Sequence, residues 1–513
     1  MRQRLPGWIS SVAIAGALIA LVAWSFRQRW QVLGASPFPL GVDGYFYPIE
    51  LRSLLDHGRL AYPASPLAFY LLAPFAALWG PITGAKLGAA LLGAAIAGPA
   101  YGVGARLGGG RGAGLVAAVL ATTSVGSAYL TIEFVKNGIG LTVALTALWL
   151  ALRATERPSL PRIAAAAGGL VAAYTTHKMA AGIVLVVAIP AALAAAGAHG
   201  ALRGRRLLYA IGGVVGLAAA ALVIGAAFPQ RLLSAADAAL LGGMVSATPR
   251  WTAPALVFPT GELALGYDAL LGLGLAIAAM IALPLRTRIA AAIPARQRRA
   301  ATPAPAAVTA ATWPILVLAL AIGLPFLAVT DRQGLGFRLR IAAFVPAALA
   351  AAIVARALLA RYVHRDAALG VLAVALAVVR QPELDGKVVT HPALVAAVQA
   401  LNGHIPAGAT LIVPERHIAF MVAWYTGAAV ALRPDQIPPA RRYRLLPLHF
   451  IGEGSPLDRQ LIAARAEPGL PRPIGVHPRH PNGLVLVAEP TWDWILARLP
   501  AADRAELVAW PTL

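Results

Sequence analysis

The chain has 513 residues, of which 59% are hydrophobic and 12% are charged. A mean hydropathy of +0.72 excludes an ordinary water-soluble domain and indicates a protein that crosses a membrane several times. The formal charge is +22, but the arginines fall in short clusters between apolar runs, which is typical of topology signals and not of a nucleic-acid-binding surface. Cysteine is absent, which excludes disulfides, thiol nucleophiles and cysteine-ligated metals.

The apolar runs predict an α-helical polytopic membrane protein. The first run follows Arg2 and Arg4, and we interpret it as an uncleaved helix and not a signal peptide, because many apolar runs come after it. A transmembrane helix needs about 20 apolar residues. Most runs approach this length, although 163–176 and 366–380 are short. We expect about eleven transmembrane helices, at 8–26, 82–105, 112–130, 138–153, 163–176, 179–198, 207–228, 263–285, 313–330, 341–359 and 366–380.

A further apolar segment, 66–80, is short and is interrupted by prolines. Arginine and lysine favour the cytoplasmic side of a membrane. If this segment crossed the membrane, the arginine clusters within 106–111, 153–162 and 203–206 would face outward. We therefore expect it to lie along the outer interface, with the amino terminus in the cytoplasm and the carboxyl terminus outside.

After residue 380 the hydropathy falls, and proline, histidine and charged residues become more frequent. This change predicts two domains: a transmembrane module, 1–380, and a small extracytoplasmic α/β domain, 381–513. Short apolar runs predict strands, and amphipathic stretches predict helices. The expected strands are 410–413, 443–446 and 484–487, and the expected helical pieces are 392–401 and 494–499.

The first outer loop, 27–81, is long for a chain with otherwise short connections, and long loops are usually functional. Near its start, Asp43 stands between glycines and aromatic residues in the sequence Gly41-Val42-Asp43-Gly44-Tyr45-Phe46-Tyr47. Other acids also fall in outer loops or at outer helix ends, which hints at a polar site facing outward. They are Glu50, Asp56, Glu133, Asp237, Glu262 and Asp331.

This loop, the segment Tyr62-Pro63-Ala64-Ser65-Pro66-Leu67-Ala68-Phe69-Tyr70, and the run that ends in Trp79-Gly80 resemble the C-type (GT-C) polytopic glycosyltransferases. The nearest branch is that of bacterial protein O-mannosyltransferases and lipid A aminoarabinose transferases, which are glycosyltransferase family 39-like. The chain differs from the family pattern in having Ser65 before Pro66-Leu67, Tyr70 where tryptophan is common, and Gly44 where many members carry a second acid.

Three later segments extend the resemblance. Glu133-Phe134-Val135-Lys136-Asn137 is similar to the second outer loop of the family, which often carries an acid. The segment that ends in Thr176-His177-Lys178 is similar to a family segment that ends in Thr-Lys. Arg338-Leu339-Arg340 is similar to a late outer loop of the family that carries arginine. Many members also have a C-terminal domain outside the membrane.

The resemblance implies an enzyme of the bacterial inner (cytoplasmic) membrane that transfers a sugar from a polyprenyl-phosphate donor to an extracytoplasmic lipid, polysaccharide or protein, with inversion. Such a site needs a base for the acceptor hydroxyl and cations for the departing phosphate. The resemblance implies that Asp43 and Glu133 are catalytic carboxylates and that Asp43 is the general base. It implies four ligands of the phosphate, Lys86, Lys178, Arg338 and Arg340. It also implies four residues of the sugar pocket, Tyr45, Tyr47, Tyr70 and His177. No residue is assigned to a metal, and the need for a divalent ion stays open.

Each assignment has a plainer alternative. Asp43 could simply form a turn, and Glu133 could be the N-cap of a helix. Lys86 and Lys178 could contact lipid headgroups, and Arg338 and Arg340 could anchor the chain at the membrane interface. His177 could lie next to the site without a role in it. After Arg416-His417, the pair Trp424-Tyr425 suits a domain core better than a glycan site. At the level of the whole protein, the alternatives are a flippase for lipid-linked glycans and a non-catalytic subunit of cell-envelope polysaccharide assembly.

Overall fold

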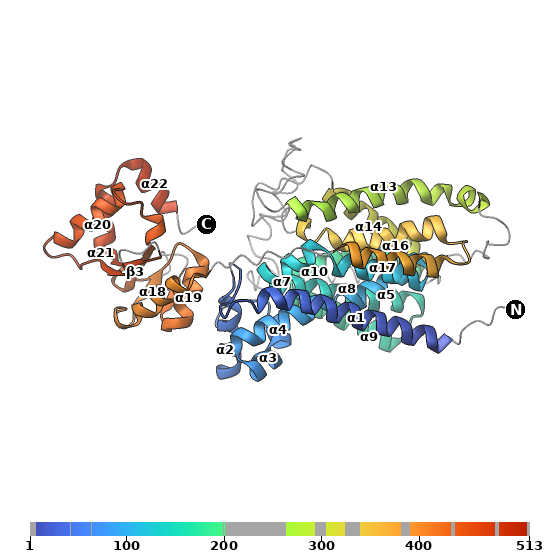
Figure 1. Ribbon diagram of the computed structural model, residues 1–513, viewed down its shortest axis with the longest axis horizontal. Helices are drawn as coiled ribbons and strands as arrows, with labels where there is room; N and C mark the ends of the chain where they lie inside the picture. Colours follow the sequence, from blue (N-terminus) through green and yellow to red (C-terminus); the bar gives the residue numbers. More distant parts are fainter. Residues whose placement is uncertain are drawn as a thin grey trace. The chain divides into compact units, whose positions relative to one another are not determined.

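The computed structural model describes residues 7–41, 43–62, 64–198, 200, 263–292, 304–323, 339–380, 390–431, 437–477 and 482–509 (Figure 1). The chain divides into two compact units. The helical unit comprises 1–31, 65–68 and 89–384, and the composite unit comprises 32–64, 69–88 and 385–513. The composite unit therefore brings most of the first outer loop together with the C-terminal part of the chain.

Long apolar helices dominate the helical unit. Each expected span that the structure describes, wholly or in part, coincides with a helix or a pair of helices, and 207–228 lies outside the described residues. The helices are α1 (Gly7–Leu33), α4 (Pro81–Ala94), α5 (Ala97–Gly108), α6 (Arg111–Thr122), α7 (Val125–Glu133), α8 (Val135–Glu156), α9 (Leu160–Thr176), α10 (Lys178–Ala198), α13 (Leu263–Ala292), α14 (Ala306–Gly323), α16 (Phe344–Leu359) and α17 (Arg365–Val379).

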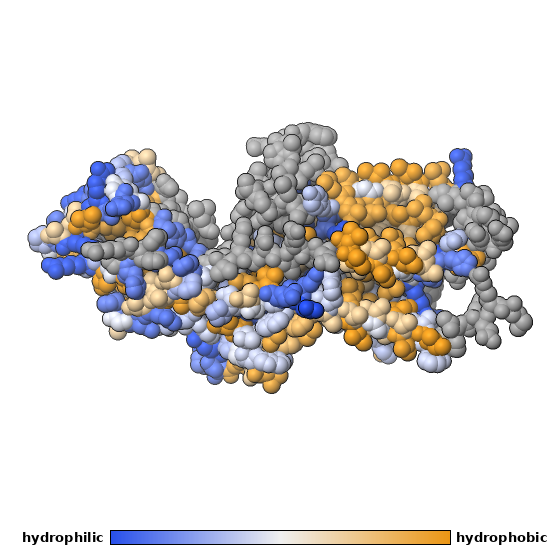
Figure 2. Space-filling model, viewed as in Figure 1, coloured by the Kyte–Doolittle hydropathy of each residue, from blue (hydrophilic) through white to orange (hydrophobic). Residues whose placement is uncertain are grey.

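In the described part of the chain, 6 helices are long and apolar enough to cross a membrane, or up to 7 if the bent pair of α6 and α7 forms one span. Because several helices have this length and apolarity, the chain is a multi-pass membrane protein. Within lipid, a helix satisfies all of its own backbone hydrogen bonds. The expected total of eleven includes α9, α16 and α17, which have 17, 16 and 15 residues, and that total stays a prediction. Apolar side chains cover much of the visible surface of these helices (Figure 2).

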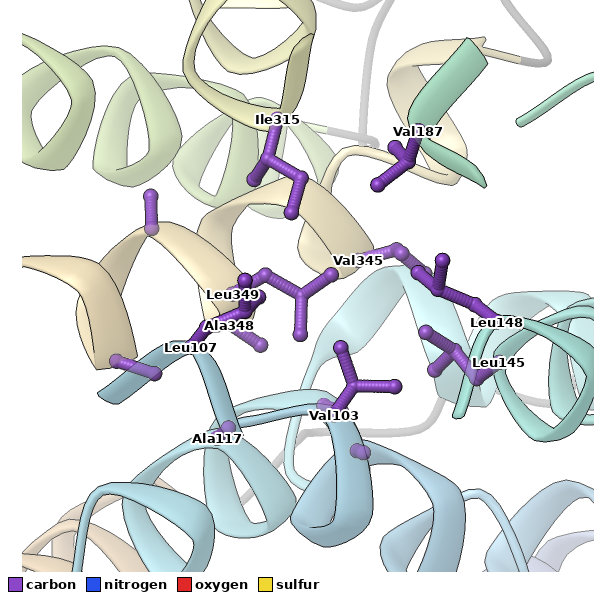
Figure 3. Close-up of a cluster of buried hydrophobic side chains, with 14 of the residues drawn as sticks. Val103, Leu107, Ala117, Leu145, Leu148, Val187, Ile315, Val345, Ala348 and Leu349 are labelled. Atoms are coloured by element: carbon purple, nitrogen blue, oxygen red, sulfur yellow. The ribbon is translucent and has the colours of Figure 1, made fainter. Parts of the chain in front are cut away.

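Small residues allow the helices to approach closely at the centre of this unit. Figure 3 shows Val103, Leu107, Leu145, Leu148 and Val345 gathered between α5, α8 and α16. A Cβ atom at Gly104 would lie 2.4 Å from the Cβ of Ala117, so the contact between α5 and α6 requires glycine there. Contacts between small residues of this kind are the usual basis of helix association in membranes.

The segment 66–80 forms α3 (Leu67–Trp79), a helix of 13 residues with Pro74 inside it. At about 1.5 Å of rise per residue it is too short to cross the hydrocarbon layer. Tyr70, Leu78 and Trp79 are 54%, 72% and 53% exposed. That this segment does not span the membrane, and that it lies at the outer interface, both stay predictions.

The C-terminal residues of the composite unit form a five-stranded mixed sheet in the order β2-β1-β3-β5-β4. Strand β1 pairs in parallel with β2 and β3, whereas β5 pairs antiparallel with β3 and β4. The strands are β1 (Thr410–Ile412), β2 (Ala429–Ala431), β3 (Arg442–Pro447), β4 (Ile474–Val476) and β5 (Leu484–Ala488). The helices of this unit are α2 (Phe46–His57), α18 (Pro392–Ala400), α19 (Arg416–Thr426), α20 (Pro456–Ala466), α21 (Glu489–Arg498) and α22 (Ala501–Ala509).

The three strands predicted from the sequence are the central ones, β1, β3 and β5, and the predicted helical pieces coincide with α18 and α21. Central strands are flanked on both sides, and every residue of β5 is buried. The edge strands β2 and β4 have three residues each and are mostly half-buried, so they lack the continuous apolar run that marks a central strand.

Candidate functional site

Asp43 lies in a tight turn that leads into α2. The amide of Gly44 donates to the carbonyl of Gly41 at 3.0 Å, and the amide of Phe46 donates to the carbonyl of Asp43 at 3.0 Å. Gly41 has a φ of 80°, which favours glycine. A Cβ atom at Gly44 would lie 2.6 Å from the carbonyl oxygen of Leu40. The turn therefore requires both glycines, and the second leaves no room for an acidic side chain beside Asp43.

The carboxylate of Asp43 contacts Arg416, the first residue of α19. Asp43 Oδ1 is buried and lies 3.1 Å from Arg416 Nε. Among the described residues, no hydrogen bond or ion pair engages Asp43 Oδ2, and the Asp43 side chain is 19% exposed. Because the Arg416 side chain is 45% exposed, this ion pair contributes only about 0–1 kcal/mol to stability. The contact is an ion pair and not a hydrogen bond, because Oδ1 has no hydrogen-bond partner within the described part of the chain.

An aromatic cluster lies beside this ion pair, with Phe420 of α19 at its centre. The ring of Phe46 lies 5.1 Å from that of Phe420, and the ring of Tyr62 lies 5.6 Å from it. Phe69 of α3 packs edge-on against Phe46 at 5.7 Å. These contacts join the first outer loop, α3 and α19, and ring pairs at such distances stabilise beyond their buried area.

Tyr45 and Tyr47, both expected in the sugar pocket, are 2% and 4% exposed. The hydroxyl of Tyr45 lies 3.1 Å from that of Tyr425, and burial together with this hydrogen bond raises the pKa of Tyr45. Tyr47 packs against Phe69 at 6.0 Å. Tyr70 is the exposed member of the predicted set. The structure therefore places two of the three tyrosines inside the aromatic core.

Glu50, one of the acids of this loop, stabilises the local structure through hydrogen bonds to the backbone. It is fully buried and accepts hydrogen bonds from the amides of Ala61 at 2.7 Å and Tyr62 at 3.1 Å. Burial and the nearby Glu50 carboxylate both raise the pKa of Tyr62. Glu50 thus closes the chain after α2 back onto that helix.

Lys86 belongs to the same unit and is 7% exposed in α4. Its Nζ donates to the carbonyl oxygen of Ser36 at 2.6 Å. Ser36 precedes the Asp43 turn by a few residues, so this contact holds the start of the loop against α4. A buried ammonium group has three donors, and this contact accounts for one of them.

The other predicted residues lie in the helical unit. Glu133 is the last residue of α7 and is half-buried, and Phe134, not Glu133, occupies the N-cap of α8. His177 caps the end of α9, and Lys178 begins α10. Arg340 is 1% exposed and lies in a short helical stretch, 339–341, that precedes α16. Arg338 lies outside the described residues.

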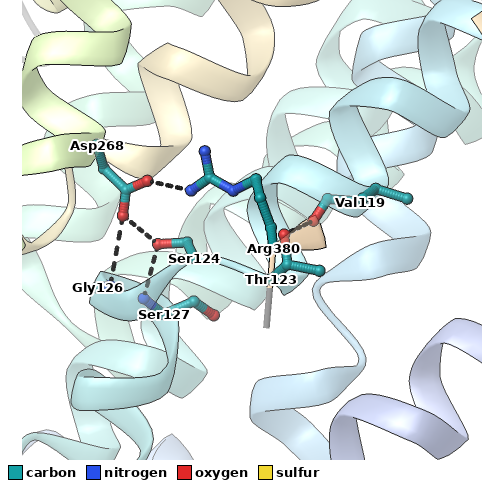
Figure 4. Close-up of polar contacts among 7 residues, drawn as sticks. All are labelled: Val119, Thr123, Ser124, Gly126, Ser127, Asp268 and Arg380. Atoms are coloured by element: carbon teal, nitrogen blue, oxygen red, sulfur yellow. Dashed lines mark hydrogen bonds and ion pairs between the residues drawn. The ribbon is translucent and has the colours of Figure 1, made fainter. Parts of the chain in front are cut away.

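A buried polar network that was not expected from the sequence lies at the break between α6 and α7 (Figure 4). Asp268 of α13 is 2% exposed. Its Oδ2 accepts from Ser124 Oγ at 2.6 Å and from the Gly126 amide at 3.5 Å, and its Oδ1 lies 2.8 Å from Arg380 Nη2. Ser124 in turn caps α7 by accepting from the amide of Ser127. In the sequence, the one signal for this network was Asp268, an acid near the start of the apolar run 263–285.

Arg29 of α1 contacts the same break and is 1% exposed. Its Nη2 donates to Ser127 Oγ at 2.9 Å and to the Thr122 carbonyl at 3.3 Å, and its Nε donates to Thr131 Oγ1 at 3.1 Å. A charge buried in a membrane protein needs such partners. Arg29 and Asp268 together therefore hold α6 and α7 at the observed bend of 46°.

Within the described ranges, no group of three histidine or acidic side chains is arranged so that it could hold a metal ion.

No described protein family matches the sequence, and no curated protein is significantly similar to it. Solved structures with some likeness include an oligosaccharyltransferase of Archaeoglobus fulgidus, at 13% identity and a TM-score of 0.49 over 88% of this chain and 70% of that one. ArnT of Cupriavidus metallidurans bound to undecaprenyl phosphate gives 15% identity and a TM-score of 0.38 over 95% and 98%. The apo form of the same protein gives 14% and 0.37 over 94% and 98%. At such identities and TM-scores, these likenesses add no family, activity or site to the resemblance drawn from the sequence.

Proposed function

We propose that the protein is a membrane glycosyltransferase that transfers a sugar from a polyprenyl-phosphate donor to an extracytoplasmic acceptor, with Asp43 as the general base. The observation that carries this proposal is the state of the Asp43 carboxylate. One oxygen is buried against Arg416, and the other has no partner among the described residues. A base needs this combination of a fixed orientation and an oxygen open to the acceptor.

The proposed reaction is a single displacement. The acceptor oxygen forms a bond to the anomeric carbon, the bond from that carbon to the phosphate oxygen breaks with its electron pair, and the acceptor proton moves to Asp43. A carboxylate is too weak a base to ionise an alcohol beforehand, so the proton moves as the new bond forms, which contributes about 10²- to 10⁴-fold to the rate.

Cations are required for the departing phosphate, and a fixed charge in a site that excludes water stabilises it most. Lys86 supports this role because it is buried in the same unit as Asp43 and near the start of the same loop. Lys178, Arg338 and Arg340 are further proposed ligands of the phosphate. Glu133 is proposed as a second acid, and Tyr70 and His177 as contacts of the sugar, with Tyr45 and Tyr47 supporting the pocket from the aromatic core.

The test is transfer in vitro from a panel of polyprenyl-phosphate sugars by the purified wild type and by Asp43→Asn, which keeps the shape of the side chain. We expect the variant to lose about 10²-fold or more in kcat. Asp56→Asn is the matched control, because Asp56 is an exposed acid of the same loop, in α2, and we expect it to keep wild-type activity.

Full activity of Asp43→Asn would refute the assignment of the base. Movement of a labelled lipid-linked sugar across proteoliposomes without transfer would instead favour the flippase. If every donor in the panel is inactive with the wild type, the protein is not a transferase of this class.

A further inference from the structure

Helix α19 presents one face to the first outer loop. Arg416, Phe420 and Trp424 are spaced by four residues, which places them on the same side of a helix. Each contacts a different residue of the loop. Arg416 contacts Asp43 at 3.1 Å, Phe420 contacts Phe46 at 5.1 Å, and Trp424 stacks under the Arg52 guanidinium at 4.2 Å. The loop that carries Asp43 is therefore shaped by a helix from the C-terminal part of the chain.

The acid beside Arg416 in sequence contacts histidines, and Arg416 contacts Asp43. This acid, Glu415, lies 3.0 Å from His449 Nε2 through Oε1 and 3.0 Å from His417 Nε2 through Oε2. Both oxygens of Glu415 are therefore occupied by imidazole groups. The guanidinium of Arg416 also lies 5.5 Å from the centre of the Phe420 ring, a cation–π contact that limits its movement.

From this geometry we infer that Arg416 is a positioning residue for the proposed reaction, and that the C-terminal part of the chain completes the active site. The inference rests on the proposed function of Asp43. Arg416 fixes Oδ1, so that Oδ2 is the oxygen presented to the acceptor hydroxyl. A small displacement of a reacting group costs a large part of the rate, and an ion pair from a packed helix is a direct way to prevent that displacement.

The experiment compares the full-length wild type with Arg416→Ala, Arg416→Lys and the control Arg459→Ala, which removes an exposed arginine from α20 of the same unit. We expect Arg416→Ala to lower kcat about 10- to 100-fold and to leave the KM for the donor unchanged. Arg416→Lys keeps the charge and should retain part of the activity. Guanidinium chloride below its denaturing range should restore part of the kcat of Arg416→Ala, a rescue that a purely structural role does not allow.

Melting temperatures of all variants separate loss of folding from loss of chemistry. If Arg416→Ala keeps the wild-type kcat, or loses activity only in proportion to its unfolded fraction, the inference is wrong. A raised donor KM with an unchanged kcat would also overturn it, because Arg416 would then bind the donor. A wild type that transfers no sugar would refute the proposed function itself, whereas an active wild type with an inactive Asp43→Asn and a fully active Arg416→Ala would refute the inference alone.

Discussion

The turn around Asp43 has room for a single carboxylate. The Leu40 carbonyl excludes a side chain at Gly44, the position where the resembled family often carries a second acid. The sequence shows this difference, and the structure gives its physical reason. The charged residue that contacts Asp43 is Arg416, which comes from a distant segment of the chain. At the scale of single residues, the candidate base thus contacts a cation, and position 44 of its turn holds no second acid.

Glu415 predicts how stability depends on pH. Burial alone would raise the pKa of its carboxyl, but the contacts with His417 and His449 outweigh burial and hold the pKa below its ordinary value of 4.5. A lowered folded-state pKa stabilises the protein above the unfolded-state pKa, and this stabilisation is lost as the pH falls through the folded-state value. We expect Glu415→Gln to melt below the wild type near neutral pH, and the difference to shrink as the pH falls below about 4.5.

The measurement is the melting temperature of the purified full-length protein across this pH range. Glu453→Gln, which removes an exposed acid from the same unit, controls for the loss of one negative charge. A difference between wild type and Glu415→Gln that stays constant with pH would contradict the prediction.

Among the elements, the bend between α6 and α7 is constrained by contacts from several neighbouring segments. Arg29 holds it from α1. Asp268 holds it from α13 (Figure 4). Gly126, in the first turn of α7, adds a steric constraint, since a Cβ atom there would lie 2.3 Å from the Ile341 carbonyl oxygen. The bend is therefore part of the folded structure and not a local irregularity. It fixes the direction of α7, which ends at Glu133.

The ion pair of Asp268 and Arg380 predicts a stability effect at this scale. Asp268 is buried, whereas Arg380 is 25% exposed. Removing Asp268 leaves this arginine without its counter-ion and Ser124 without its acceptor, which costs about 3 kcal/mol. We expect Asp268→Ala to be destabilised by about this amount, and Asp268→Ala/Arg380→Ala to be destabilised less, because the double variant leaves no unpaired arginine.

Unfolding in detergent, followed for both variants and for the exposed-site control Asp56→Ala, measures these differences. A double variant that is less stable than Asp268→Ala would show that Arg380 stabilises the fold through some other contact, and would contradict the prediction.

At the scale of the whole molecule, the distribution of arginines predicts a topology. It places the loop between α8 and α9 in the cytoplasm and the C-terminal α/β part outside. Because the chain has no cysteine, single cysteines can be introduced without a background. Ser159 in that loop and Glu453 in the C-terminal part are both exposed.

We expect a membrane-impermeant maleimide to label Glu453→Cys in intact spheroplasts, and to label Ser159→Cys only after the membrane has been opened. Labelling of Ser159→Cys in intact spheroplasts would reverse the orientation and would place Asp43 on the wrong side for the proposed acceptor.

The sequence by itself determined the features that depend on local pattern. Apolar runs of sufficient length located the helices, continuous apolar runs located the central strands β1, β3 and β5, and glycines marked the turn that carries Asp43. These signals are readable because burial in lipid or in a sheet acts on every residue of a segment.

Only the tertiary structure decided which segments meet. Arg52 contacts the carbonyl of Trp424 across 372 positions of sequence, Arg380 contacts Asp268 across 112, and Arg29 contacts Thr131 across 102. Charged and aromatic side chains occur in many places along the chain, and no local pattern states which pairs are brought together. Packing of the helices and of α19 against the loop selects these pairs, and for that reason Arg416 became visible as the partner of Asp43 only in the folded chain.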